Sequence, residues 1–399
     1  MRRPRNPIGR IAGLAALGVL LTAPAVVGTA LGVGAATPCG SGDIVVSTTA
    51  DSGAGSLRAA FAAANASSVG SVNTICVDTS TVTSPIQLST GVLTYTGGLE
   101  LDIRGNGATV QANGTSGIIA QTSGSNLVIS DVTLTGGHAD SGAAIHSGGG
   151  GEVSLTNSTI EGNVADEDGG GISANVANVF NSTIADNRAG EGGGGGFSVS
   201  TLKAVNSTIT GNSDSVDIGG GASVFSSITL VYSTVTDNTG TQGANLQLNS
   251  ESGTLTSFAS VVTDPHGSTN CHQDATTSQG YNYSDDASCG FTATAQGDRQ
   301  NASDPMLGAL GNNGGPTATR LPATGSPLIN AVPTASCQAG GASGITTDQR
   351  GVTRPQLGGC DIGSVEVEPA APTTTTTTAT TTSTAAPATP VTAAPAFTG

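Results

Sequence analysis

The sequence has no tryptophan, and its 399 residues include only 7 phenylalanines and 4 tyrosines. A compact globular domain of this length usually fills its core with more large side chains. A thin core assembled from valine, isoleucine, leucine and alanine needs fewer of them. The scarcity of aromatic residues therefore favours a stacked architecture over a single thick core.

Basic residues are also scarce: 12 lysines and arginines face 28 aspartates and glutamates, and the formal net charge is −16. Four of the arginines precede residue 11, and Lys203 is the only lysine. Nucleic-acid binding requires a basic surface that this chain lacks. Anionic membranes are equally poor partners, and we expect no membrane insertion of the mature chain.

The two ends of the chain are predicted to lie outside the folded part. Residues 1–36 have the features of a secretory signal peptide, because arginines precede an apolar stretch from Ile11 to Leu21 and small residues follow. A transmembrane anchor is the alternative, but glycine, proline and threonine crowd residues 22–34. Residues 370–399 are uncharged and rich in threonine, alanine and proline, which predicts a disordered stalk. The mature protein is therefore expected outside the cell, secreted or associated with the cell surface or wall.

Between Leu127 and Ser250 the chain repeats one pattern with a period near 25 residues. A threonine followed by an aliphatic residue recurs at intervals of 26, 24, 25 and 26 residues, and glycine runs such as Gly169–Gly171 recur in phase with it. Repeats of this length stack into solenoids, because one coil alone cannot bury enough apolar surface to be stable. The threonines are Thr133, Thr159, Thr183, Thr208 and Thr234.

These features predict an all-β fold, a right-handed parallel β-helix with about 25 residues per coil. A leucine-rich repeat is the alternative at this period, but its leucine framework and helical half are absent. A short helix after Ser56 is predicted to cover the first coil, since Leu57, Phe61 and Ala64 fall on one face. We divide the chain into the signal peptide (1–36), the N-terminal cap and first coils (37–126), regular coils (127–250), last coils and a C-terminal module (251–369), and the stalk (370–399).

Six cysteines in an exported chain indicate disulfide bonds. Fifteen pairings are possible in principle. Sequence proximity favours three pairs, which would staple the N-terminal end and an irregular C-terminal cap: Cys39 with Cys76, Cys271 with Cys289, and Cys337 with Cys360. Metal coordination by these cysteines is disfavoured, because there is no CxxC sequence and His272 stands alone beside Cys271.

Two columns of asparagine recur in the repeats and are predicted to form hydrogen-bonded ladders along the solenoid. The first comprises Asn157, Asn181 and Asn206. The second comprises Asn163, Asn187, Asn212 and Asn238. The first column also lies in Asn-Ser-Thr glycosylation sequons, but the ladder accounts for the same residues.

Acidic residues in successive glycine-rich loops are the only candidates for a metal site. Stacked, they could supply hard oxygen ligands for calcium, but a charged rim that keeps the solenoid soluble and blocks edge pairing is the favoured explanation. These residues are Asp140, Asp168, Glu191 and Asp217. Calcium apart, no cofactor is expected.

A second acidic pair, Asp186 and Asp237, occupies one column two coils apart, which corresponds to about 9.6 Å. This separation is near that of the two carboxylates in inverting glycosidases. Solvated aspartates in exposed turns are the alternative. No Ser-His-Asp set can be picked out, so we assign no catalytic or cofactor-binding residue.

Three parts of the chain resemble exported bacterial right-handed parallel β-helix repeat proteins. They are the opening Gly53–Arg58 stretch, the Gly-Gly-Gly-Ile and Asn-Ser-Thr-Ile coils, and the Cys271–Glu366 segment, which resembles a C-terminal choice-of-anchor module of type Q. The coils are also similar to the GGAI-type repeats of polymorphic outer membrane proteins. The Pro395–Gly399 ending resembles an LPxTG sortase signal, with Ala394 in place of leucine. The resemblance implies an architecture and a surface anchor, not a shared reaction.

We therefore expect a monomeric adhesion or glycan-binding module at the cell surface, with a polysaccharide or other surface glycan as its partner. The alternative is a carbohydrate-active enzyme of the parallel β-helix type, either a polysaccharide lyase or a hydrolase. The absence of a convincing catalytic set favours the non-catalytic module.

Overall fold

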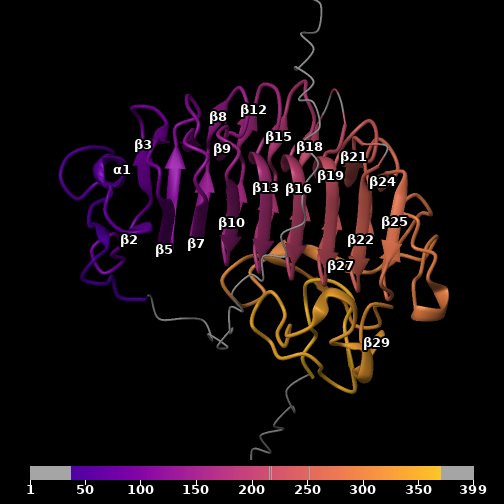
Figure 1. Cartoon of the computed structure of the whole chain (residues 1–399). Helices are drawn as coiled ribbons and strands as arrows, with labels where there is room; N and C mark the ends of the chain where they lie inside the picture. The colour runs from indigo at the N-terminus through magenta and orange to yellow at the C-terminus, as the bar shows by residue number, and fades with distance from the viewer. Residues whose placement is uncertain (1–36, 215, 217, 251, 370–399) are drawn as a thin grey trace, which may run out of the picture.

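The computed structural model describes residues 37–214, 216, 218–250 and 252–369. The predicted signal peptide and stalk lie outside this part of the chain. The described residues form an all-β parallel solenoid (Figure 1), which confirms the predicted fold class. Thr133 pairs with Thr159 and Thr208 with Thr234, so that one coil takes 26 residues at these points. Within the described chain, no helix has both the length and the apolar character needed to cross a membrane.

Each coil contributes to several parallel columns of strands. The broad lateral column contains β1 (Ile44–Val46), β2 (Val72–Val77), β5 (Glu100–Ala112), β7 (Leu127–Thr135), β10 (Glu152–Thr156), β13 (Ile172–Phe180), β16 (Phe197–Val205), β19 (Ala222–Val231), β22 (Thr254–Phe258) and β25 (Ala275–Ser278). The threonine column continues from β5 and β7 through β11 (Thr159–Glu161), β14 (Thr183–Ala185), β17 (Thr208–Thr210), β20 (Thr234–Thr236), β23 (Val261–Thr263) and β26 (Tyr283–Ser284), and it starts at β3 (Ile86–Leu88).

Two further columns complete the coils. One contains β4 (Leu93–Tyr95), β6 (Ile119–Gln121), β9 (Ile145–Ser147), β21 (Leu246–Leu248) and β24 (Cys271–His272), which pair with the starts of the long lateral strands. The other is a sheet of four two-residue strands, β8 (His138–Ala139), β12 (Val164–Ala165), β15 (Arg188–Ala189) and β18 (Ser213–Asp214). Inside the coils, aliphatic residues at equivalent positions stack in register. Ile160, Ile184 and Ile209 form one such stack and are fully buried.

A single residue with positive φ turns each coil from the lateral column into the threonine column. Its φ lies between 46° and 53° in five successive coils, at Asp131, Asn157, Asn181, Asn206 and Tyr232. Asparagine adopts this left-handed conformation more readily than most residues. Among the described residues, no hydrogen bond joins Asn157 to Asn181 or Asn181 to Asn206. The first predicted ladder is therefore corrected: among the described members of this column, the side-chain hydrogen bond runs from Asn157 Nδ2 to Asp131 Oδ1 at 3.2 Å, and the left-handed backbone explains the rest.

The second asparagine column does form a ladder. Asn163 Nδ2 donates to Asn187 Oδ1 at 2.9 Å, and the bonds from Asn187 to Asn212 and from Asn212 to Asn238 measure 3.0 Å. The ladder continues through Asn245 and Asn270. These side chains are fully buried. Each Oδ1 of the predicted column also accepts a backbone N–H from the preceding coil, so the ladder satisfies main-chain groups that the turn leaves unpaired.

A serine ladder runs beside it and was not predicted. The hydroxyl of Ser182 accepts the N–H of Ser158 at 3.1 Å, and that of Ser207 accepts the N–H of Ser182 at 3.2 Å. Each hydroxyl donates to the carbonyl two residues earlier in its own chain segment. Serine in the Asn-Ser-Thr sequence is therefore a structural hydrogen-bonding residue.

The N-terminal end of the solenoid is closed by α1 (Leu57–Ala66). The hydroxyl of Ser56 accepts the N–H of Ala59 at 3.1 Å and caps the helix, as the sequence predicts. Leu57, Phe61 and Ala64 are buried in the solenoid core. The disulfide between Cys39 and Cys76 fixes the segment before β1 to β2.

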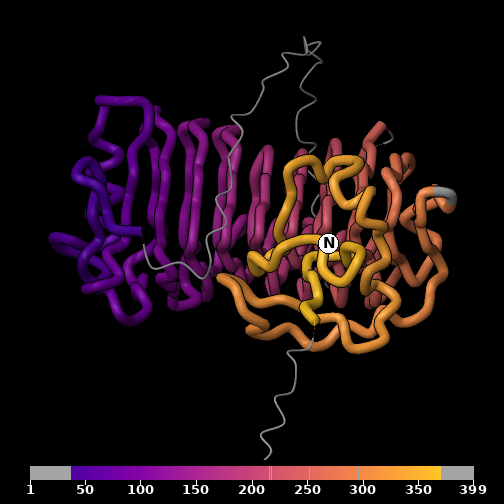
Figure 2. The backbone as a smooth tube through the Cα atoms, turned by 90° about the horizontal axis from the view of Figure 1, so that it is seen from below, coloured from indigo at the N-terminus to yellow at the C-terminus, as the bar shows by residue number. Residues whose placement is uncertain are grey.

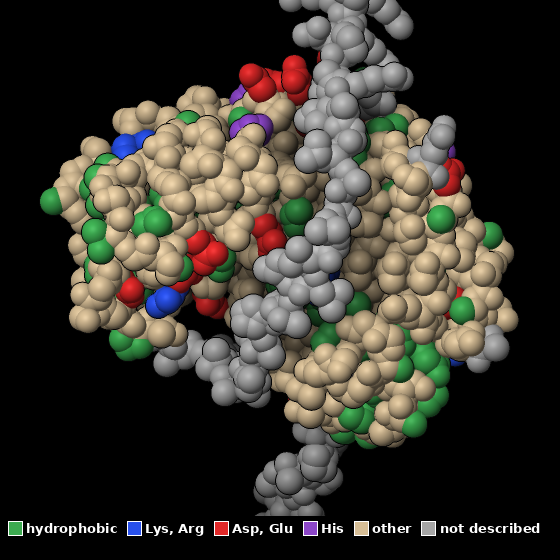
Figure 3. Space-filling model, viewed as in Figure 1, with side chains coloured by type: hydrophobic (Ala, Val, Ile, Leu, Met, Phe, Trp, Pro, Cys, Tyr) green, Lys and Arg blue, Asp and Glu red, His purple; other side chains and the backbone are tan. Residues whose placement is uncertain are grey.

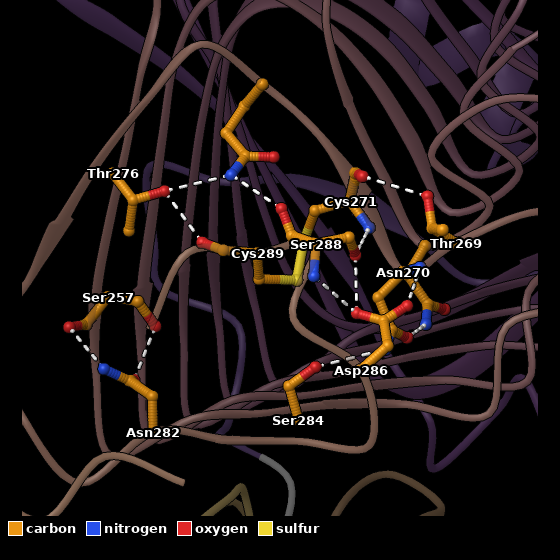
Figure 4. Close-up of a disulfide and its surroundings, with 12 residues drawn as sticks. Ser257, Thr269, Asn270, Cys271, Thr276, Asn282, Ser284, Asp286, Ser288 and Cys289 are labelled. Atoms are coloured by element: carbon orange, nitrogen blue, oxygen red, sulfur yellow. Dashed lines mark hydrogen bonds between the residues drawn. A yellow bond between two sulfur atoms is a disulfide. The ribbon is translucent and has the colours of Figure 1, made fainter. Parts of the chain in front are cut away.

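The C-terminal end is closed by the loop that follows β26 and by η1 (Thr294–Gln296), with Phe291 buried in the solenoid core. The disulfide between Cys271 and Cys289 ties this loop to β24 (Figure 4). Asp286 organises the loop by accepting the N–H groups of Asn270 and Ser288, both at 2.9 Å. Burial acts to raise the pKa of Asp286, but these hydrogen bonds outweigh it and lower the pKa.

The rest of the C-terminal region, residues 300–369, does not cap the end but runs back along the side of the solenoid (Figure 2). We call it the flanking module. It contains β27 (Leu307–Gly311), β28 (Thr319–Pro322), β29 (Val332–Pro333), β30 (Gly359–Cys360), η2 (Thr334–Ser336) and η3 (Gly340–Ala342). The third disulfide joins Cys337 to Cys360 inside it. All three bonds are the pairs that sequence proximity favours.

The flanking module covers the threonine column of the later coils. Gln349 Nε2 donates to Thr183 Oγ1 at 2.9 Å, and Thr208 Oγ1 donates to Gln349 Oε1 at 2.7 Å. The N–H of Ser364 donates to Thr234 Oγ1 at 3.0 Å. These three threonines are almost completely buried. In these coils, therefore, the threonine column is an internal docking surface.

A buried ion pair holds the module together at this interface. Arg354 and Glu366 are 2.9 Å apart, and both side chains are fully buried. The guanidinium of Arg354 also stacks on the ring of Tyr232 in the solenoid, 4.2 Å from its centroid. Burial raises the pKa of Glu366, although the positive charge of Arg354 opposes this.

Replacing Asn187 with alanine is expected to lower the free energy of unfolding by about 2–4 kcal/mol, because it leaves several buried amide and main-chain groups unpaired. Asn157→Gly is the matched control, since glycine satisfies the left-handed turn, and it is expected to change stability by less than about 0.5 kcal/mol. Urea unfolding of both variants measures the difference. Equal losses would contradict the distinct roles of the two columns.

Replacing Glu366 with glutamine is expected to cost about 3 kcal/mol, because Arg354 then stays buried without its counterion. Undocking of the module would expose the peptide bond after Arg350, whose side chain is only 7% exposed. Limited trypsin digestion therefore measures the effect, with the exposed Glu368 changed to glutamine as control. A digestion rate unchanged from that of the control would show that the ion pair does not hold the module.

Candidate functional site

The acidic loops predicted to bind calcium lie along one edge of the solenoid. Figure 3 shows acidic side chains and histidines gathered at the upper edge, in the region of β8 and β12. Asp140 and Glu191 are exposed, Asp168 is half-buried, and Asp217 lies outside the described residues. His138 Nε2 lies 3.0 Å from a carboxylate oxygen of Asp166.

These carboxylates do not converge within the described part of the chain. There, the only three ligand-type groups within 4.8 Å of one another are those of Cys39, Asp43 and Cys76, and both sulfur atoms belong to a disulfide. Calcium usually takes 6–8 oxygen ligands. The described carboxylates offer no such set, and calcium binding stays a prediction that would need Asp217.

The pair Asp186 and Asp237 lies in the turn between the threonine column and the sheet of β8, β12, β15 and β18, where Asp237 contacts the flanking module. Both residues have positive φ, 53° and 62°, in the turn that follows the threonine column. Gly211 occupies the same turn in the coil between them, and a Cβ there would lie 2.2 Å from Asp186 Oδ1. Glycine therefore leaves room for the Asp186 carboxylate to extend across the intervening coil.

A histidine and an arginine bind Asp237. His266 Nε2 lies 2.6 Å from Oδ1, and Arg320 on β28 of the flanking module bonds Oδ2. Burial acts to raise the pKa of Asp237, but His266 and Arg320 outweigh it and lower the pKa. Burial raises the pKa of Asp186, and the charge of Asp237 adds to this, although Arg320 opposes it. The two carboxyl groups thus shift in opposite directions.

Opposite shifts are the arrangement that an acid and a base require in glycoside hydrolysis. The pair, however, is separated by two coils, or about 9.6 Å, at the upper limit for an inverting enzyme. Both oxygens of Asp237 are already engaged, by His266 and Arg320, whereas a general base must be able to activate a water molecule. The geometry therefore fits a structural contact, in which Asp237 joins the coils to Arg320 of the flanking module, better than it fits a catalytic pair.

A different surface presents the most regular set of ligand-type side chains. On the outer face of the lateral column, one polar residue per coil follows the axis in strict register. The spacing is about 4.8 Å per coil. We call this set the polar row: Ser154, Asn178, Lys203, Thr229, Thr256 and Thr277. Lys203 and Thr277 are exposed and the others are half-buried.

The flanking module forms a wall along part of this face. Two residues further along the same strands, a second row contains Phe180, Val205, Val231 and Phe258. The exposure of these side chains falls from half-buried at Phe180 to 0% at Phe258. Phe258 and Val231 lie under η3, next to Gly340 and Gly341. Lys203 Nζ stands 5.6 Å from the ring centroid of Phe180. The open face therefore combines hydroxyls, an amide, a cation and one accessible ring beside a raised edge.

Sequence reasoning singled out Asp237 but missed its partner Arg320, and it missed the polar row. Arg320 is 83 residues away from Asp237, and no local pattern links them. One signal was present: four of the eight basic residues after the leader fall between Arg299 and Arg354, where they can reach acids on the coils. Only the last three members of the polar row share a residue type, threonine, so the row as a whole carries no residue repeat.

Replacing Asp186 and Asp237 singly with asparagine is expected to shift stability in opposite directions. A raised pKa contributes stability only while the carboxyl is protonated, so Asp186→Asn should stabilise the protein at neutral pH and lose this gain below about pH 3.9. A lowered pKa contributes stability while the carboxylate is charged, so Asp237→Asn should destabilise at neutral pH, and the loss should vanish as pH falls through the folded pKa.

Solvent exposure limits each change to about 0.2–1 kcal/mol. Urea midpoints at about pH 7 and about pH 3 measure both changes. Since asparagine also accepts the left-handed turn, each variant serves as the control for the other. Urea midpoints that change in the same direction in both variants at neutral pH would contradict this structural role.

Comparisons of the chain with models of protein families, with curated proteins and with solved structures found no match. The resemblance of residues Cys271–Glu366 to a choice-of-anchor module therefore stays a prediction. The parallel β-solenoid is shown by the structure itself, and the function has to be argued from its surfaces.

Proposed function

We propose that the mature protein is an exported, non-catalytic adhesion module that binds a linear glycan along the polar row. The observation that carries this proposal is the register of the row: six coils in succession each present one hydrogen-bonding side chain on an open face. Hydroxyl and amide groups match the hydroxyls of a sugar chain. A linear polymer lying along the axis would meet an equivalent contact at each coil.

The disulfides support export. All six cysteines are paired, and disulfides persist in oxidising compartments outside the cytosol. The flanking module supports a binding role for the lateral face, because it occupies the threonine column and leaves the polar row uncovered at Lys203 and Thr277.

A carbohydrate-active enzyme is the second candidate. The opposite pKa shifts of Asp186 and Asp237 favour it, since they provide one carboxyl that protonates more readily and one that stays ionised. The engagement of both Asp237 oxygens by His266 and Arg320 weighs against it.

Titration of the purified mature protein with a panel of neutral and acidic polysaccharides tests the proposal. Binding without shortening of the chains is expected. The double variant Asn178→Ala with Lys203→Ala should weaken binding at least about tenfold, because it removes an amide and the only lysine at the centre of the row.

The matched control is Asp140→Ala in the acidic loops, which should bind like the wild type. A chelator added to a parallel titration reports any contribution of calcium. Chain cleavage that disappears in Asp237→Asn would establish the enzyme instead, and binding that is unchanged in the double variant would refute the polar row as the site.

A further inference from the structure

We propose that the peptide bond between Asp264 and Pro265 is a self-cleavage site, at which the aspartate side chain cuts its own chain under mildly acidic conditions. This site is independent of glycan binding. It lies in the turn after β23, on the module-bearing side of the solenoid.

The backbone at Asp264 is strained. The turn requires a left-handed residue in each coil, and Gly136, Gly162 and Gly211 supply it with φ between 63° and 74°. Asp264 adopts φ 50° at the same place and is followed by proline. Asp186 and Asp237 also occupy this turn, with φ of 53° and 62°, but proline follows Asp264 alone. A following proline restricts the residue before it to extended backbone, so the left-handed conformation is more strained at Asp264 than at the other two aspartates. Cleavage of the bond after Asp264 would release this strain.

The carboxyl group of Asp264 is fixed beside its own peptide bond. Thr236 and Thr263 hydroxyls donate to Oδ2 at 3.3 and 3.4 Å, and the N–H of Asp264 donates to Asp285 Oδ2 at 3.0 Å. Burial raises the pKa of the Asp264 carboxyl, and the negative charges of Asp285 and Asp304 add to this.

The basic side chains beside this turn bind a different carboxylate. His266 and Arg320 both bind Asp237, and within the described part of the chain neither forms an ion pair with Asp264. Asp264 therefore gains a proton at a higher pH than an ordinary aspartate, while the fold is still held together by its coils.

The chemistry needs only the protein and water. One oxygen of the Asp264 carboxyl attacks the carbonyl carbon of the same residue and forms a five-membered cyclic anhydride. The bond from that carbon to the nitrogen of Pro265 breaks, and the carboxyl proton moves to this nitrogen, which becomes a free secondary amine. Water then opens the anhydride and leaves Asp264 with two carboxyl groups at the new C-terminus. An intramolecular attack of this kind gains from proximity.

The cut would yield two fragments that stay assembled. No disulfide spans residue 264, because Cys39 pairs with Cys76 before it and the other two pairs follow it. The strands β24, β25 and β26 after the cut pair with β21, β22 and β23 before it. The fragments therefore separate only on unfolding, and they do so without reductant.

The chain contains a matched internal comparison, the bond between Asp304 and Pro305. Asp304 is exposed and is not among the described residues with positive φ. Its Oδ1 accepts the N–H of Met306 at 2.6 Å. If cleavage depended only on the Asp–Pro sequence, both bonds would break at the same rate.

The test incubates the mature protein at about pH 4, near the ordinary pKa of aspartate, with protease inhibitors present. Mass spectrometry follows the N-terminal fragments that end at Asp264 and at Asp304, and circular dichroism confirms that the protein stays folded. Cleavage after Asp264 is expected to be at least about tenfold faster, equivalent to about 1.4 kcal/mol of activation free energy. In concentrated urea at the same pH the two rates should become similar.

The control variant Asp264→Gly restores the residue that other coils use in this turn, so it should fold, and it should lose cleavage at this position alone. The proposal is overturned if the folded protein stays intact after Asp264, if both bonds break at equal rates in the folded state, or if Asp264→Gly is still cut there.

Discussion

Hydrogen bonding between successive coils is the constraint on which the whole molecule depends. A coil of this length buries too few aliphatic side chains to offset the entropy of ordering its backbone. The parallel strands pair main-chain groups across coils, and the asparagine and serine ladders pair those that the turns would leave unsatisfied. The ladders are buried, so removal of one member would leave the polar groups of its neighbours buried without a hydrogen-bond partner.

The same regular spacing creates the two functional faces. Equal coils place Thr183, Thr208 and Thr234 in one line, and the flanking module docks on this line through Gln349 and Ser364. Occupation of one face by the chain itself leaves the lateral face as the open one. Two arginines of the flanking module form ion pairs at this interface. Arg354 pairs with Glu366 inside it, and Arg320 pairs with Asp237 at its edge.

The sequence predicts the solenoid because its period is carried by buried residues that must repeat: the aliphatic stack and the column from Asn163 to Asn238. It predicts the N-terminal cap separately, from Ser56 and the apolar face of the helix that follows. It misleads at Asn157, Asn181 and Asn206, since asparagine serves both ladders and left-handed turns and only the backbone distinguishes them. It is silent on docking, because Thr183 and Gln349 are 166 residues apart. It is also silent on the polar row, because only the last three of its six members share a residue type.

The most direct test of the proposed glycan binding is a crystal structure of the mature protein grown with a fragment of the polysaccharide that gives the strongest signal in the titration. The account predicts electron density for the sugar along the polar row, in contact with Asn178, Lys203 and Thr229 and parallel to the solenoid axis. Density confined to the acidic loops around Asp140 and Asp168, or to the turn at Asp186 and Asp237, would contradict it.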